Sequence, residues 1–385
     1  MELGGVERSL LGLLDALDYA RFEVDLFLFA HIGEMMKYIP AGVKLLPEEK
    51  LYRLRFAPIA DLLHMGRFFI VTIRLISKIF GKLRKLLRMG EDIYTCLCIR
   101  ILTFFLRKQP REYDLALGFM APHYYLLRKV NAAIKIGWVH TDYRVELLDV
   151  SFSRKMWEET DTIAAVSEGV RASFCALYPV LADKTITVEN ILNPTFIRRE
   201  AAAFDARPLM NAGSGFVILS VGRFCYAKAF DEAISACKIL AAEGRPFCWC
   251  FIGYGMEEEF LQKQIIDMNL SDYAVILGKK ENPYPYMAAC DLFALSSRYE
   301  GKAVAVREAQ ILGKPVLIAD FPTAQSQLIN GFDGYICPMG AEGIAAGVRH
   351  MMDNPAFMKT LTQNVLRSDY SNKNALDELF ARLEL

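Results

Sequence analysis

The stretch DLFALSSRYEGKAVAVREAQILGKPVLI, residues 291–318, carries the pattern that decides the fold. A short apolar run at Asp291–Leu295 is followed by a polar loop, a segment with helical spacing and a second apolar run at Pro315–Ile318. Short apolar runs that alternate with amphipathic helices are typical of a parallel sheet covered by helices on both faces. This stretch therefore predicts one strand–helix–strand unit of an α/β domain.

The same alternation runs through the second half of the chain. Amphipathic segments at residues 231–242 and 257–268 separate further apolar runs. The runs predicted as strands are Phe216–Val221, Phe247–Ile252, Ala274–Leu277, Asp291–Leu295, Pro315–Ile318 and Gly334–Cys337. Together they predict one Rossmann-like domain.

The first half shows the pattern again, with interruptions. A helix is expected near Val6–Leu17, and the Ala/Arg-rich segment from Asn193 to Gly215 is interpreted as a linker. The predicted strands are Phe22–Phe29, Val43–Leu46, Leu115–Phe119, Ile134–Val139, Thr162–Val166 and Thr185–Val188. We therefore expect an acceptor-side domain over residues 1–200 and a donor-binding domain over residues 201–365. A final helix in residues 366–385 is expected to pack back on the first domain.

The beginning of the chain departs from this pattern. A Rossmann domain normally starts with a buried strand, and the loop after it feeds the first helix. Here Gly4 and Gly5 follow Met1 almost at once, so no residues are present for that strand. The expectation is that the natural start lies upstream or that the chain is a fragment.

Composition sets the broad class of protein. Of 385 residues, 53% are hydrophobic and 23% charged, which excludes a mainly disordered chain, and the net charge of zero gives no indication of nucleic-acid binding. The nine cysteines are scattered without a CxxC pair, so reduced thiols are expected rather than a zinc site or disulfides. Cys248 and Cys250 are expected on one face of a buried strand. No signal peptide or long apolar span is evident, which favours a cytoplasmic protein.

Two glutamates in the opening stretch suggest a ligand site. Glu300 and Glu308 are eight residues apart, on either side of a predicted helix start that contains Gly301, Lys302 and Ala303. Free backbone N–H groups and the positive end of the helix dipole at such a start suit a diphosphate. The carboxylates would accept hydrogen bonds from sugar hydroxyls. The alternative is a capped surface helix with two solvated glutamates.

Two further loops follow strands of the same predicted sheet. Arg223 and Lys228 come after one strand, where two cations suit phosphate oxygens. Gly253 and Gly255 follow the next strand, and glycines there would let the backbone approach a ligand closely. Taken singly, each loop is equally explained as ordinary solvated chain. Their common position at the carboxyl ends of strands, where open α/β sheets bind ligands, favours one site.

With these motifs the sequence resembles family 4 of the retaining glycosyltransferases, in particular bacterial enzymes of capsule or lipopolysaccharide assembly. That resemblance implies the GT-B fold, with two Rossmann-like domains facing each other across a cleft. The matching stretches are Val221-Gly222-Arg223 with Lys228, residues 251–255, Leu277-Gly278 with Asn282-Pro283, residues 291–308 and residues 313–316.

The resemblance also implies roles for individual residues. Arg223 and Lys228 would bind the donor diphosphate and stabilise its departure. Glu308 would bind the nucleotide ribose, Glu300 the transferred sugar, and the segment containing Asn282 would lie beside the nucleobase.

Two positions depart from the family pattern. Ala229 stands where glycine is usual, and Ala303 where proline is frequent. Both are small residues, so the site is expected to survive the changes.

The acceptor side is matched by two shorter motifs. Gly4 and Gly5 resemble the glycine-rich loop that meets the donor phosphates and the acceptor. His140, at the end of a predicted strand, corresponds to the active-site histidine near the transferred sugar. The alternative for a lone histidine is a structural role.

The implied reaction moves a hexosyl group from a nucleotide-diphosphate sugar to a glycan or lipid-linked acceptor in surface polysaccharide synthesis. The anomeric configuration would be retained by a front-face displacement. The sequence contains no Asp-x-Asp motif, so neither a catalytic metal nor a cofactor is expected. Another sugar-nucleotide enzyme on this fold, such as an epimerase, and an inactive binding scaffold remain alternatives.

An insertion at residues 51–110 is locally basic, with twelve Lys or Arg against three Asp or Glu among many apolar residues. The basic residues that are interleaved with apolar ones are Arg74, Lys78, Lys82, Arg84, Lys85 and Arg88. A basic amphipathic helix of this type can lie on an anionic bilayer, which predicts peripheral association with the inner face of the plasma membrane. The alternative is a core-packed helix with a solvated basic face, and nucleic acid is not expected as a partner.

Overall fold

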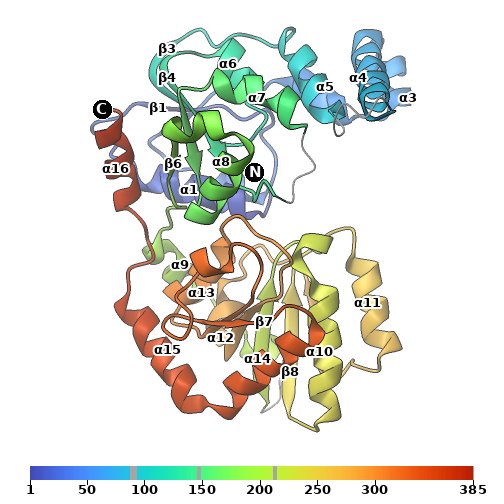
Figure 1. Cartoon of the computed structure of the whole chain (residues 1–385), viewed down its shortest axis with the longest axis vertical. Coiled ribbons are helices and arrows are strands. Elements are labelled where there is room, and N and C mark those ends of the chain that lie inside the picture. Colours follow the sequence, from blue (N-terminus) through green and yellow to red (C-terminus); the bar gives the residue numbers. More distant parts are fainter. Residues whose placement is uncertain (87–92, 145–148, 211–214, 385) are drawn as a thin grey trace. The chain divides into compact units, whose positions relative to one another are not determined.

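The computed structural model describes residues 1–86, 93–144, 149–210 and 215–384 (Figure 1). Contacts divide the chain into two compact units. Unit 1 comprises Met1 and Leu17–Glu189, and unit 2 comprises Glu2–Ala16 and Asn190–Leu385. Each unit contains parallel β-sheet flanked by helices, and each is described by itself below.

The sheet of unit 2 has six parallel strands in the order β12-β11-β10-β7-β8-β9. Their bounds are β7 Phe216–Val221, β8 Phe247–Ile252, β9 Ala274–Gly278, β10 Leu292–Leu295, β11 Val316–Ala319 and β12 Tyr335–Cys337. The helices are α1 Gly5–Ala16, α9 Pro194–Ala201, α10 Phe230–Ala242, α11 Glu258–Asp267, α12 Tyr284–Ala289, α13 Val304–Ile311, α14 Ala341–Asp353, α15 Pro355–Arg367 and α16 Asn374–Arg382. The six predicted strands and their parallel arrangement are confirmed.

Alternate residues of the central strands feed two separate cores. In β7, Ile218 packs on one side with α10, α11 and α14, whereas Leu219 packs on the other with α9, α12 and α13. Successive side chains of a strand point to opposite faces, so a strand buried on both faces reads as one continuous apolar run. Cys248 and Cys250 share a face of β8 and are buried free thiols, as the sequence predicts.

The segment predicted as a linker is helical instead. α9 begins at Pro194, and the Asn193 side chain accepts a hydrogen bond from the backbone N–H of Phe196. An N-cap followed by proline in the first turn is a strong helix start. α9 buries Ile197 and packs against α12 and α13, so this segment belongs to the core of unit 2.

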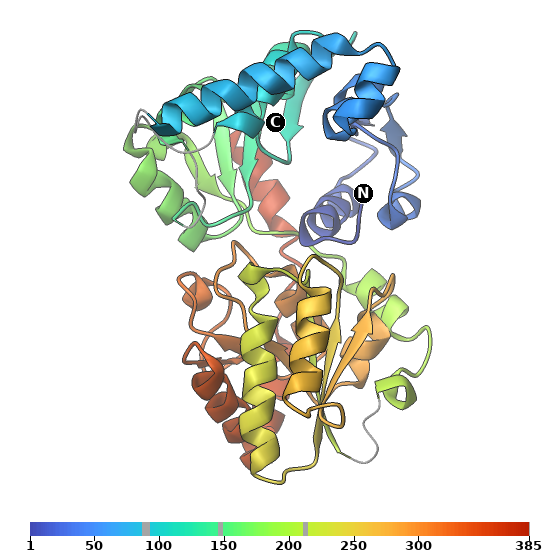
Figure 2. The same ribbon diagram turned by 90° about the vertical axis from the view of Figure 1, so that its right-hand side faces the viewer.

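Unit 1 holds two separate parallel sheets (Figure 2). One has two strands, β1 Val24–Leu26 and β2 Val43–Leu45. The other has four in the order β3-β4-β5-β6, with bounds β3 Glu112–Gly118, β4 Asn131–Val139, β5 Thr162–Ala165 and β6 Thr185–Thr187. The helices beside this second sheet are α6 Tyr124–Lys129, α7 Val150–Glu158 and α8 Glu168–Leu177. In the described chain no strand precedes α1, as the sequence indicates.

The insertion between β2 and β3 is helical. Its helices are α2 Lys50–Arg53, α3 Ile59–His64, α4 Phe68–Leu86 and α5 Tyr94–Thr103, and α4 packs against α3 and α5. Arg88, named above among the basic residues, lies outside the described residues. No described helix is both long enough and apolar enough to cross a membrane.

Candidate functional site

The predicted site residues of unit 2 gather where the strand order reverses. β7 lies between β8 and β10, so the chain leaves β7 towards one edge of the sheet and later returns to its other side at β10. Ligands of open α/β sheets bind at this kind of switch point, outside the carboxyl ends of the strands. The loops that leave β7 and β10 carry Lys228 and Glu300, respectively.

These two loops are joined by a charged hydrogen bond. Lys228 Nζ donates to Glu300 Oε1 at 2.5 Å, and Ser297 Oγ donates to the same oxygen at 2.6 Å. Ser296 Oγ donates to the Lys228 carbonyl oxygen at 2.8 Å, which ties the loop backbones together as well. The side chains of Lys228 and Glu300 are 22% and 11% exposed, so both remain open to a ligand.

The loop between Glu300 and α13 is anchored by the segment around a 3₁₀ turn, η6 (Ala324–Ser326). Three of its contacts are Thr323 Oγ1 to the Glu300 carbonyl at 2.7 Å, Lys302 Nζ to the Ser326 carbonyl at 2.6 Å, and Ala303 N–H to Gln327 Oε1 at 2.8 Å. Lys302 is buried with its ammonium on this carbonyl. The loop is therefore held in place without a ligand, with Lys302 as one of its anchors.

The two glycines after β8 have a packing role. A Cβ on Gly253 would lie 1.9 Å from the Gly222 carbonyl oxygen, and one on Gly255 would lie 2.2 Å from the Phe224 carbonyl oxygen. The loop after β8 can therefore rest on the loop after β7 only because these positions lack side chains. Arg223 lies in the loop after β7. Its exposed side chain forms no hydrogen bond or ion pair within the described residues.

Glu308 has a different environment from Glu300. Its side chain is fully buried on α13, with Oε2 accepting from the Arg8 guanidinium at 2.6 Å and Oε1 accepting from the Tyr284 hydroxyl at 2.7 Å. The Arg8 guanidinium also lies over the Tyr284 ring, 5.3 Å from its centroid. A buried carboxylate needs such compensation, because an unpaired one is strongly destabilising.

The start of α1 lies against the start of α13. A Cβ on Gly5, the first residue of α1, would be 3.6 Å from Cγ2 of Val304, the first residue of α13. The Gly4 carbonyl accepts a hydrogen bond from the Arg8 backbone N–H at 3.1 Å, within the first turn. Two helix N-termini, each the positive end of a helix dipole, thus meet beside the buried Glu308.

The side chain of Asn282 forms hydrogen bonds within unit 2 through both its nitrogen and its oxygen. Its Nδ2 donates to the Glu200 carbonyl at 2.9 Å, and its Oδ1 accepts from the Tyr284 backbone N–H at 3.1 Å. Asn282 therefore links α9 to the start of α12, which also positions Tyr284 against Glu308.

His140 belongs to unit 1 and follows β4. Burial lowers its pKa to about 4, which keeps the imidazole neutral at pH 7. Its ring lies 4.7 Å from that of Phe119, and its buried Nε2 has no hydrogen-bond partner in the described chain. Buried polar atoms are usually paired, so this nitrogen is suited to meeting a ligand.

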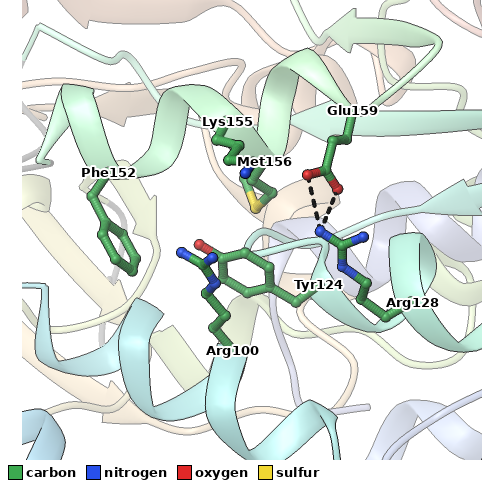
Figure 3. A pocket seen from close by; sticks show the side chains of 7 residues that line it. All are labelled: Arg100, Tyr124, Arg128, Phe152, Lys155, Met156 and Glu159. Atoms are coloured by element: carbon green, nitrogen blue, oxygen red, sulfur yellow. Dashed lines mark hydrogen bonds and ion pairs between the residues drawn. The ribbon is translucent and has the colours of Figure 1, made fainter.

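A small pocket of unit 1 contains none of the predicted site residues (Figure 3). It lies among α5, α6 and α7, and an ion pair between Arg128 and Glu159 forms one wall, with an N–O distance of 2.7 Å. The empty volume is about 220 Å³, below the usual size of a small-molecule site.

Several residues of the site are not among those predicted from the sequence. Arg8 and Tyr284 compensate Glu308, while Thr323 and Gln327 anchor the loop before α13. Arg8 stands three residues after the Gly4-Gly5 pair and Tyr284 two residues after Asn282, so both adjoin recognised motifs. No local spacing indicates Thr323 or Gln327.

Ala229, which stands where the family pattern has glycine, is expected to lower the stability of the fold. Ala229 lies between Lys228 and α10 with φ 50° and ψ 41°, a left-handed conformation that favours glycine. We expect Ala229→Gly to raise the free energy of unfolding by up to about 1 kcal/mol, because the relieved strain exceeds the added chain entropy. Ala346→Gly, at an exposed position inside α14, should lower it by about the same amount. Denaturant unfolding measures both, and a loss of stability in both variants would contradict the assignment of strain.

Comparisons with known proteins agree with this architecture. Residues 205–367 match the family model described as "Glycosyl transferases group 1". The lipopolysaccharide core biosynthesis glycosyltransferase LpsD of Rhizobium meliloti (strain 1021) is 28% identical over 203 residues, covering 51% of this chain and 57% of LpsD. The amylovoran biosynthesis glycosyltransferase AmsK of Erwinia amylovora is 34% identical over 138 residues, 34% of each chain. The alignments thus cover a little over half the length of LpsD and about a third of the length of AmsK.

A solved structure is similar over nearly the whole chain. Anabaena Alr3699/HepE in complex with UDP-glucose superposes with a TM-score of 0.68 at 16% sequence identity, covering 99% of this chain and 97% of that one. At this identity the likeness concerns the fold, and it confirms the predicted GT-B class. We conclude that this chain has the GT-B fold and that its residues 205–367 match the family of group 1 glycosyltransferases.

Proposed function

We propose that this protein transfers a hexosyl group from a nucleotide-diphosphate sugar to a glycan or lipid-linked acceptor, with retention of anomeric configuration. The observation that carries the proposal is the pairing of Lys228 with Glu300 at the switch point between β7 and β10. The names of LpsD and AmsK support a role in surface polysaccharide synthesis, and the UDP-glucose complex of the Anabaena protein supports this donor class.

The diphosphate is proposed to bind between the basic loop and the helix starts. Lys228 and the exposed Arg223 supply positive charge, and the N-termini of α13 and α1 supply backbone N–H groups and dipoles. These groups would also stabilise the charge that develops on the departing diphosphate. The reaction in this proposal therefore uses no metal ion.

Glu300 is proposed to orient the transferred sugar. Its Oε1 is occupied by Lys228 and Ser297, whereas Oε2 has no hydrogen bond within the described residues. A carboxylate held by one oxygen presents the other in a fixed position to a sugar hydroxyl. His140 of unit 1, neutral at pH 7, is proposed to contact the same sugar through Nε2.

Glu308 is proposed to bind the nucleotide ribose, with the Asn282 loop beside the base. Both oxygens of Glu308 already accept hydrogen bonds, from Arg8 and Tyr284. A carboxylate offers about four acceptor positions, so a ribose hydroxyl can join these donors or replace Arg8. Because the side chain is fully buried, ribose binding here requires Arg8 to shift.

The division of roles between Glu300 and Lys228 can be tested by substitution. We expect Glu300→Gln and Glu300→Ala to slow donor hydrolysis and transfer by about a hundredfold or more, because the sugar loses its positioned acceptor. Binding of the matching nucleoside diphosphate should change less than about threefold, since the charge of Lys228 remains. A panel of nucleotide sugars for turnover and calorimetry for binding provide the two measurements.

Lys228→Ala should weaken nucleotide binding more than the Glu300 substitutions do. Losing charge-assisted hydrogen bonds to phosphate should weaken nucleoside diphosphate binding by about ten- to a hundredfold. Lys238→Ala, on the exposed side of α10, serves as the matched control and should change neither binding nor turnover. Full turnover by the Glu300 variants would refute the proposed role of that residue.

A membrane surface is proposed as the second partner, bound through α4. The buried face of this helix is partly made of small residues, Ser77 and Gly81, whereas large apolar side chains point outward. The exposed apolar residues of α4 are Phe68, Phe69, Leu75, Ile76, Ile79, Phe80, Leu83 and Leu86. Although α4 also buries Ile70, Val71 and Ile73, this exposed apolar surface favours a surface contact over a helix that only solvates its basic face.

The basic residues of α4 fall into two groups. Arg74 donates to the Ala57 carbonyl and Arg84 pairs with Asp149, so these two cations stabilise unit 1. Lys78, Lys82 and Lys85 are exposed among the apolar side chains. Exposed apolar surface interleaved with lysine fits the interface of an anionic bilayer, where burial and charge both contribute. Such binding would place the protein on the inner face of the plasma membrane, near lipid-linked acceptors.

Vesicle sedimentation tests this surface. We expect the protein to sediment with vesicles containing anionic phosphatidylglycerol at low salt, and to be released at high salt. Changing Lys78, Lys82 and Lys85 together to Gln should weaken binding by about a hundredfold, from about 1 kcal/mol for each lysine. Changing the exposed Lys238, Lys263 and Lys359 of unit 2 should leave it unchanged. Equal binding by both triple variants, or none by the unaltered protein, would contradict the proposal.

A further inference from the structure

The turn that carries Lys228 is held through its backbone carbonyls. It is a single 3₁₀ turn, η5 (Tyr226–Lys228), in the loop between β7 and α10. Each of its three carbonyl groups accepts a hydrogen bond from the loop after β10. The donors are Ser296 Oγ to the Lys228 carbonyl at 2.8 Å, the Arg298 backbone N–H to the Ala227 carbonyl at 2.8 Å, and Arg298 Nη1 to the Tyr226 carbonyl at 2.8 Å. Arg298 therefore supplies two of the three contacts.

The guanidinium of Arg298 also joins this turn to the start of α10. Nη1 donates to Asp231 Oδ1 at 3.0 Å and Nη2 donates to Asp231 Oδ2 at 2.6 Å, which makes a two-pronged ion pair. Nη2 donates in addition to Glu232 Oε1 at 3.4 Å. The planar guanidinium of arginine suits such paired contacts, whereas the ammonium of lysine is a single point of charge. One side chain thus links the loop after β10, the turn η5 and the first turn of α10.

An aromatic contact adds to these hydrogen bonds. The Arg298 guanidinium lies over the Tyr226 ring, 4.3 Å from its centroid, where the face of the ring attracts a cation. The Tyr226 side chain is exposed, whereas that of Arg298 is only 18% exposed. Arg298 is therefore packed between the two loops, with Tyr226 on its outer side.

The charge of Arg298 is compensated within unit 2. Asp231 and Glu232 supply two carboxylates for one guanidinium, and the two Nη atoms donate the four side-chain hydrogen bonds described above. A diphosphate would have to displace a carboxylate to reach these N–H groups. The ammonium of Lys228, by contrast, contacts Glu300, and the Lys228 side chain is 22% exposed. Arg298 is therefore suited to positioning Lys228 and not to binding the phosphate.

We propose that Arg298 is a positioning residue of the donor site, which fixes η5 so that the Lys228 ammonium meets the donor diphosphate. The inference rests on the proposed function, because it assigns Lys228 to the diphosphate. Without Arg298, only the Ser296 hydroxyl would still join the loop after β10 to the carbonyls of the turn. A misplacement of about 1 Å in a reacting site can lower a rate by about a hundredfold.

Nucleotide binding and donor hydrolysis test this role. The probe is UDP, GDP or ADP, whichever binds the unaltered protein, in calorimetry, and the corresponding nucleotide sugar for turnover. We expect Arg298→Ala to weaken binding by about tenfold and to lower turnover at saturating donor by about ten- to a hundredfold, because Lys228 is no longer fixed. Arg298→Lys should behave like Arg298→Ala, since it keeps the charge but loses the two-pronged pair.

A double substitution separates positioning from a general loss of stability. In the Lys228→Ala background, Arg298→Ala should change binding by less than about threefold, because Arg298 acts through Lys228. Arg245→Ala is the matched control. Arg245 forms a similar pair with Asp353, with N–O distances of 2.5 and 3.1 Å, but it precedes β8 at the amino ends of the strands. The control should change neither binding nor turnover, and thermal unfolding shows whether each variant is folded.

Asp231→Asn distinguishes positioning from direct contact with phosphate. Positioning predicts binding weaker by at least about threefold, because Arg298 loses its charged partner. If Arg298 bound the phosphate itself, its release from Asp231 would strengthen binding, and that result would overturn the proposal. So would Arg298→Ala with the binding and turnover of the Arg245 variant, or additive effects of the Lys228 and Arg298 substitutions. Unchanged binding in Lys228→Ala would instead refute the proposed role of Lys228 in the reaction, and this inference with it.

Discussion

The packing of α1 into unit 2 depends on one fully buried charge, the carboxylate of Glu308. A fully buried carboxylate is tolerated only when both oxygens are compensated. The compensating groups are Arg8 of α1 and Tyr284 of α12, so the first helix of the chain meets α12 and α13 at this residue. The same requirement places the start of α1 against the start of α13.

Glu300, on the loop before the same helix, differs from Glu308 in its exposure to solvent. Its carboxylate is partly exposed, shares one oxygen between Lys228 and Ser297, and lies on a loop held by Thr323 and Gln327. A fixed but accessible carboxylate suits contact with a substrate, whereas a buried one such as Glu308 also organises the fold. Preorganisation of this kind lowers the cost of orienting a ligand.

The sequence predicts the strands of unit 2 well because those strands are buried on both faces. The bounds of β7 and β8 agree with the predicted runs Phe216–Val221 and Phe247–Ile252. β3 begins three residues earlier than predicted, because its first residues alternate between exposed and half-buried positions and interrupt the apolar run. Asn193-Pro194 carries a helix-start signal for α9, but the Ala/Arg-rich composition that follows favours a linker instead.

The contacts that join the site residues are harder to predict than the residues themselves. Lys228 and Glu300 follow neighbouring strands of a parallel sheet, so topology alone brings their loops together. The ion pair between Arg8 and Glu308 joins residues 300 positions apart, and no periodicity or spacing indicates it. Such a contact follows from the packing of α1 into unit 2, which depends on side-chain shapes across the whole domain.

In the proposed reaction, a nucleoside diphosphate binds to unit 2 at the carboxyl ends of β7 and β10. Hydrogen exchange of the full chain with and without UDP, GDP or ADP measures whether it does. One of these nucleotides should slow exchange in residues 222–229 and 301–305, and Lys228→Ala should remove the effect. Protection confined to other segments, or no protection by any of the three, would show that the diphosphate does not bind there.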